Sequence, residues 1–145
     1  MKAWTVAALV VAASMGAAAA AGADAIKERR AIMKANGEAT KPVVPILKGA
    51  APFDLAKVQK ALNTYADSAE KMPALFPDDS KTGDTNALPA IWQDKADFEA
   101  RFKKMGADAK AALADIKDEA SFKSIMPGFF KNCGGCHEKY RKKED

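Results

Sequence analysis

Hydrophobic residues recur every three or four positions along most of the chain, which is the spacing of one face of an α-helix. The clearest run follows Asp54, an expected helix cap, and ends at Met72 because Pro73 cannot continue a helix. Its large apolar positions alternate in steps of three and four: Leu55, Val58, Leu62, Tyr65, Ala69 and Met72. This pattern predicts an amphipathic helix that packs in a bundle.

Three other segments have the same period, namely residues 24–41, 91–116 and 118–140. Residues 73–90 contain several prolines and are predicted to form a long loop. Pro127 falls inside the last periodic segment, so we expect a kink or a late helix start there. We find no alternating pattern typical of a strand. The sequence therefore predicts an all-α fold, an antiparallel up-down-up-down four-helix bundle.

The start of the chain departs from this pattern. A basic start, an apolar run and small residues at its end make residues 1–21 a predicted secretory signal peptide. Cleavage after Ala20 or Ala21 leaves residues 22–145 as one exported domain. An uncleaved membrane anchor is the alternative, because the run is nearly long enough to span a bilayer. The second half is almost entirely Ala and Gly, which favours cleavage, no membrane span in the mature protein and a periplasmic location in a bacterium.

Composition narrows the range of functions. The 145 residues are 48% hydrophobic and 29% charged, which is ordinary for a globular protein and excludes a wholly disordered chain. The formal net charge of +4 comes with plentiful, interspersed acids, so we expect no nucleic-acid partner. Two cysteines and one histidine cannot supply a zinc site of four Cys or His ligands from this chain alone.

One motif carries clear chemistry: Cys133-Gly134-Gly135-Cys136-His137 is the CxxCH attachment sequence for c-type haem. Cys133 and Cys136 are three residues apart, so on a helix their thiols lie on one face and can add to the two haem vinyl groups. His137 follows at once and can reach the iron from the same side. The two glycines leave room for the ring close to the backbone. We therefore predict one haem c, held covalently through two thioethers.

Other uses of the two thiols are less consistent with the sequence. A disulfide between Cys133 and Cys136 would suit an exported protein, but it does not require His137. A thioredoxin-like pair follows a strand at the start of a helix, whereas this pair is near the end of the last predicted helix. A zinc site at these residues lacks a fourth soft ligand.

The second axial ligand of the iron is predicted to be a methionine. His137 is the only histidine, so ligation by two histidines of one chain is excluded. Met126 is on the same helix, roughly 16 Å away along its axis, and Met105 is expected to lie too deep in the bundle. In this topology Met33 and Met72 lie at the height of His137, and Met33 is on the inward face. Two possibilities remain open: Met33 binds the iron, or it only packs against the haem.

With these features the chain resembles the class II c-type cytochromes, that is, the cytochrome c′ family and its low-spin relatives similar to cytochrome c-556. The most specific matching segment is the CxxCHxxYR ending at residues 133–141. Residues 29–37, Leu75-Phe76-Pro77 and Ile91-Trp92 also match. The resemblance covers essentially the whole predicted mature chain.

The resemblance implies roles for further residues. Arg29 corresponds to a basic residue near a haem propionate, Arg141 to the basic residue one turn after the proximal histidine, and Trp92 to a residue packed beside the porphyrin. His137 would be the proximal ligand. The low-spin branch places a ligating methionine at the position of Met33, whereas high-spin members leave the iron five-coordinate.

These implications lead to two functions. With Met33 bound, the protein is a periplasmic one-electron carrier that acts on redox partner proteins. With Met33 aside, it is a high-spin cytochrome c′ that binds nitric oxide or carbon monoxide. Neither is an enzyme, since a peroxidase would use a second histidine or a comparable acid–base pair. Basic residues near the C-terminus form either an ordinary solvated tail or a rim that steers an acidic redox partner. The resemblance allows a homodimer formed through the first two helices.

Overall fold

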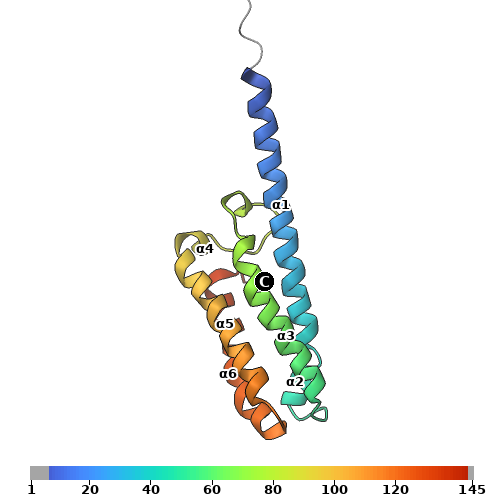
Figure 1. The fold of residues 1–145 in the computed structure, drawn as a ribbon. Helices are drawn as coiled ribbons and strands as arrows, with labels where there is room; N and C mark the ends of the chain where they lie inside the picture. Colours follow the sequence, from blue (N-terminus) through green and yellow to red (C-terminus); the bar gives the residue numbers. More distant parts are fainter. Residues whose placement is uncertain (1–6, 144–145) are drawn as a thin grey trace, which may run out of the picture.

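The computed structural model describes the backbone of residues 7–143 and the side chains from residue 20 onward. Four long helices form an antiparallel up-down-up-down bundle (Figure 1), as the sequence predicts: α1 (Ala7–Thr40), α3 (Leu55–Lys71), α5 (Lys95–Asp115) and α6 (Glu119–Tyr140). Four short elements connect them: α2 (Val43–Leu47), α4 (Ala90–Gln93) and the 3-10 turns η1 (Met72–Leu75) and η2 (Asp78–Ser80). Within these described residues we find no strand, so the all-α prediction is confirmed.

The first part of α1 contains most of the predicted signal peptide. Residues 1–6 lie outside the described residues, and the dark blue part of α1 extends beyond the other helices (Figure 1). Along the part of the chain that the structure describes, no helix combines the length and apolar character needed to cross a membrane. The cleavage site stays a prediction.

Aspartates begin three of the long helices. Asp54 accepts a hydrogen bond from the Lys57 amide at 3.1 Å, as expected for the cap of α3. Asp118 and Ser121 form a capping box at the start of α6, each side chain accepting from the other residue's amide. Asp94 caps α5 with a single hydrogen bond, accepting from the Asp97 amide at 3.3 Å. These caps satisfy amide groups that would otherwise have no partner and so fix where each helix starts.

The prolines act as expected at two places and differently at two others. The first long helix ends at Thr40, before Pro42, and α3 ends at Lys71, before Pro73. The short helix α2 follows Pro42 and contains Pro45, and it buries Val43 and Ile46 almost completely. Proline is tolerated there because the first turn of a helix needs no amide donor. The expectation of a late helix start at Pro127 is wrong, because α6 begins at Glu119 and runs through this residue.

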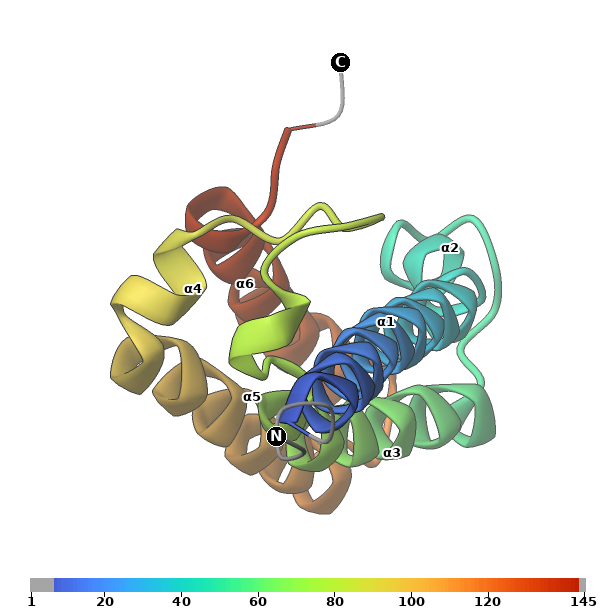
Figure 2. The ribbon, with the colours of Figure 1, turned by 90° about the horizontal axis from the view of Figure 1, so that it is seen from above.

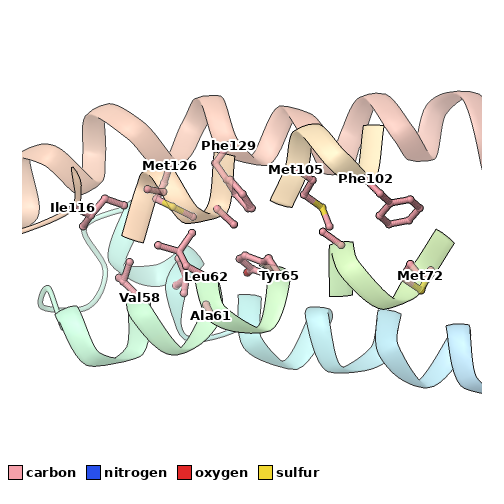
Figure 3. Close-up of a cluster of buried hydrophobic side chains, with 14 of the residues drawn as sticks. Val58, Ala61, Leu62, Tyr65, Met72, Phe102, Met105, Ile116, Met126 and Phe129 are labelled. Carbon is pink, nitrogen blue, oxygen red and sulfur yellow. The ribbon is translucent and has the colours of Figure 1, made fainter. Parts of the chain in front are cut away.

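A continuous apolar core fills the bundle (Figure 3). The inward positions predicted for residues 55–72 are confirmed from Val58 on α3 to Met72 at the start of η1, whereas Leu55 is only half-buried. The Tyr65 ring stacks on Phe129 of α6 with 5.2 Å between centroids. The core thus reaches from the α2 end of the bundle to the end where the long loop and the chain terminus meet.

At that end, the loop after η2 is joined to the end of α6, and the two run close together in Figure 2. The Leu88 amide donates to the Tyr140 carbonyl at 2.9 Å, and the Lys142 amide donates to the Asn86 carbonyl at 2.8 Å. Between them Ala87 and Arg141 form an isolated antiparallel bridge. This contact closes one side of the region that contains the CxxCH motif.

Candidate functional site

Two adjoining cavities, of about 100 and 300 Å³, open at the loop end of the bundle. Five side chains line both of them: Met33, Phe102, Cys136, His137 and Arg141. They come from α1, from α5 and from the last turns of α6 with its C-cap. The structure therefore brings Met33 and His137 to a common space, at the relative height that the bundle topology predicts.

The walls of these cavities are mostly apolar. The smaller cavity is completed by Arg29 and by Met72, Phe76, Ala87, Ile91, Phe98 and Tyr140. The larger one is completed by Asn36, Gly37, Thr40, Tyr65, Met105, Asn132 and Cys133. A concave, largely apolar space with a few polar groups at fixed places is typical of a cofactor site.

Cys133 and Cys136 are half-buried free thiols on neighbouring turns of α6, so the structure does not join them in a disulfide. Burial raises the pKa of both thiols. Reactive redox cysteines have a lowered pKa instead, so this environment does not favour the thioredoxin-like alternative. Gly134 has open space where a Cβ would stand, and a Cβ on Gly135 would come no closer than 3.7 Å to Arg101. Packing of the protein alone therefore does not require these two glycines.

The Arg29 side chain is buried, with 4% of its surface exposed. Its Nη1 donates to the Leu75 carbonyl at 3.0 Å and to Ser80 Oγ at 2.8 Å. Its Nη2 donates to the Ser80 carbonyl at 3.0 Å and to Thr85 Oγ1 at 2.8 Å. Burial lowers the pKa of the guanidinium. Of the described carboxylates, none forms an ion pair with it. A buried cation with neutral partners suits a cavity that receives an anionic group.

Arg141 and Trp92, the other two residues predicted to lie near the cofactor, are less buried than Arg29. Arg141 lines both cavities and is an exposed residue. Trp92 is not among the lining residues of either cavity. Its Nε1 donates to the Phe76 carbonyl at 3.0 Å, and its ring lies 6.0 Å from that of Phe76. Trp92 therefore supports a wall residue from behind.

The structure also contains a charged cluster that the sequence analysis did not identify. Asp97 accepts hydrogen bonds from Tyr140 Oη at 2.5 Å, from Arg101 Nε at 2.7 Å and from Lys139 Nζ at 3.0 Å. These donors hold the pKa of Asp97 well below its usual range, and the carboxylates of Asp94 and Asp97 raise the pKa of Lys139. The cluster fastens the motif-bearing end of α6 to the start of α5.

The other methionines have distinct positions. Met72 and Met105 each line one cavity and belong to the buried core, whereas Met33 lines both and is half-buried. Met105 is roughly 15 Å along α5, which begins at Lys95, so it lies less deep than expected and lines the larger cavity. That it does not bind the iron stays a prediction. Met126 is fully buried and lines neither cavity.

Comparisons of the sequence and of the structure with known proteins find relatives in one protein family. A family model described as Cytochrome C′ matches residues 24–141. A cytochrome c′ of Rhodopseudomonas palustris is 53% identical over 141 residues, covering 97% of this chain and 95% of the relative. A cytochrome c-556 of Agrobacterium fabrum is 37% identical over 145 residues, 99% of each chain. A solved structure of R. palustris cytochrome c′ has a TM-score of 0.82 at 54% identity, covering 84% of this chain and 98% of that one.

Proposed function

This chain belongs to the cytochrome c′ family, whose members carry covalently attached haem c, and from that premise we propose that it is a one-electron carrier with a His/Met-ligated, low-spin haem. Cys133 and Cys136 would form the two thioethers, and His137 and Met33 would be the axial ligands. The observation that carries this proposal is that Met33 and His137 line the same two cavities from opposite ends of the chain.

Haem iron with one histidine and one methionine ligand exchanges single electrons between its ferrous and ferric states. The protein's contribution is to hold its side chains in fixed positions around the cofactor. Buried apolar groups such as Phe98 and Phe102 exclude water from the site. Arg29 and Arg141, which line the smaller cavity, would supply positive charge to an anionic group of the cofactor, and Trp92 supports Phe76 from behind.

The second candidate is a five-coordinate haem protein that binds nitric oxide or carbon monoxide. It is favoured by the relative named cytochrome c′, which is 53% identical, against 37% for the relative named cytochrome c-556. In that case Met33 packs beside the cofactor without binding it. In both cases we propose a binding or carrier protein without enzymatic turnover.

We also propose that residues 1–21 are a cleaved signal peptide and that the domain of residues 22–145 acts in the periplasm. The family match begins at residue 24, just after the predicted cleavage site, which supports this division. Acidic redox proteins are the proposed partners, because basic residues gather near the end of α6: Lys131, Lys139, Arg141, Lys142 and Lys143. A homodimer through the first two long helices stays a prediction.

An absorption spectrum of the mature haem-loaded protein, with and without carbon monoxide, tests the ligation. We expect a low-spin spectrum with a sulfur-to-iron band in the far red that carbon monoxide does not change. Met33→Ala should remove the band and give a high-spin spectrum. The control is Met126→Leu, a volume-conserving change at a buried methionine that lines neither cavity. A wild-type spectrum that is high-spin and shifts with carbon monoxide would replace this proposal with the gas-binding one.

A further inference from the structure

The carboxamide of Asn36 lies between α1 and α3, next to the sulfur of Met33. Its Nδ2 donates to Ser68 Oγ at 2.8 Å and lies 3.8 Å from Met33 Sδ, within the range for a weak hydrogen bond to sulfur. Asn36 follows Met33 by three residues, so both side chains lie on one face of α1. Asn36 and Met33 also line the larger cavity together. The amide group thus directly contacts the atom proposed to bind the iron.

The orientation of this amide is set by the sulfur. A thioether carries no proton and can only accept a hydrogen bond, so the NH₂ group and not the carbonyl oxygen must face Met33. This leaves Asn36 Oδ1 buried and without a partner among the described residues. Leaving a buried carbonyl oxygen unpaired is unfavourable. A flipped amide would let Oδ1 accept from Ser68 but would place it against the sulfur, with two acceptors facing each other.

Ser68 holds the amide from the other side. It is a polar residue in the apolar face of α3, with 3% of its surface exposed, and its hydroxyl oxygen accepts the hydrogen bond from Asn36. One turn further along α1, Thr40 Oγ1 lies 2.7 Å from Tyr65 Oη of the same face of α3. Two polar contacts therefore fix this part of α1 relative to α3, and the position of Asn36 relative to Met33 follows from them.

We propose that Asn36 is a positioning residue for the axial ligand: held by Ser68, it donates to one lone pair of the Met33 sulfur and keeps the other directed into the cavity. This inference rests on the proposed ligation of iron by Met33 and deepens it. Whether the iron is six-coordinate or five-coordinate would then depend on a residue that does not itself bind the metal.

The test compares Asn36→Leu with the wild type, both as mature haem-loaded protein. Leucine keeps the approximate shape and removes the donor. We expect a weaker far-red sulfur-to-iron band, a larger high-spin fraction and a carbon monoxide affinity roughly two- to fivefold higher, the factor that corresponds to a weak net hydrogen bond. Ser68→Ala, which leaves Asn36 in place, should change the same three quantities in the same direction by a smaller factor.

The matched control is Asn63→Leu. Asn63 is exposed and its amide donates to the Gln59 carbonyl within α3, away from the cavities. If Met33→Ala turns the low-spin protein high-spin while Asn36→Leu and Ser68→Ala leave the spectra equal to those of Asn63→Leu, the positioning role is refuted and the ligation stands. If the wild type itself lacks the far-red band, the ligation fails and the positioning role fails with it.

Discussion

Replacing the buried Arg29 with leucine should destabilise the protein far more than the loss of an exposed charge such as Arg30. The buried guanidinium donates four hydrogen bonds, two to main-chain carbonyls and two to hydroxyls. One acceptor residue, Ser80, is completely buried, so water cannot readily replace the lost donor there. The guanidinium carbon also lies 4.5 Å from the centre of the Phe76 ring. A leucine at this position can replace none of these contacts.

The size of the effect follows from the groups left behind. A buried carbonyl without a donor costs about 1–3 kcal/mol, which applies to Ser80. The carbonyl of Leu75 is only part-buried, so water can reach it and its loss costs less. Loss of the cation–π contact adds about 0.5–2 kcal/mol. Removing the buried charge saves part of its desolvation cost. We expect a net loss of roughly 2–4 kcal/mol in the free energy of unfolding, the balance of these contributions.

Urea unfolding of the mature haem-loaded protein measures this value by linear extrapolation. Arg30→Leu is the matched control, because the next residue pairs with Asp84 through side chains that are 56% and 89% exposed. That change should cost about 1 kcal/mol or less. Arg29→Lys keeps the charge without the planar set of donors and should fall between the two. Equal stabilities of Arg29→Leu and Arg30→Leu would refute the reasoning.

Three further predictions concern the helices and their contacts. Asp97→Asn should make the free energy of unfolding depend less on pH in the acidic range. The low folded pKa of Asp97 gives a stabilisation that is complete above its ordinary pKa of 3.8 and is lost as the pH falls toward the folded value. Unfolding midpoints measured against pH test this. Gly128→Ala should stabilise the protein by about 0.5–1 kcal/mol, because nothing lies within 4 Å of the new methyl group. Gly106→Ala should bring no such gain, because its methyl group would meet Ala69 at 3.2 Å. Thermal melts compare the two variants. Asp118→Ala removes the cap of α6 and should lower the stability by about 1 kcal/mol in the same urea assay, while an unchanged midpoint would mean that the cap is redundant.

Much of the fold could be predicted because its signals are local. The period of apolar residues reports the helix face, and Asp54 and Asp118 mark helix starts through hydrogen bonds within the first turn. The short helix α2 was not predicted, because Pro42 and Pro45 read as helix breakers until their places at the helix start are known. The break before α5 was also missed, although Asp94 is a good capping residue.

Some residues of the site could likewise be predicted from local sequence and others could not. Cys133, Cys136 and His137 are adjacent in sequence, so one motif identifies them. The partners of Arg29 lie 46 to 56 residues away in sequence, and no local pattern reports which loop folds over which helix. The contact between Asn36 and Ser68 spans 32 residues and depends on how α1 is rotated against α3. Such contacts follow from the packing of the whole bundle and become visible only with it.

Met33 lies on the first long helix and His137 near the end of the last one, on the walls of the same cavities. A bond from each of them to one metal ion would therefore close a covalent ring that contains most of the mature chain. By the usual loop-entropy relation, a cross-link that spans about 100 residues reduces the freedom of the unfolded chain by about 4.7 kcal/mol. The ligand proposed to control the chemistry of the iron would thus also act as a reversible cross-link, which constrains the chain only while Met33 stays bound to the metal.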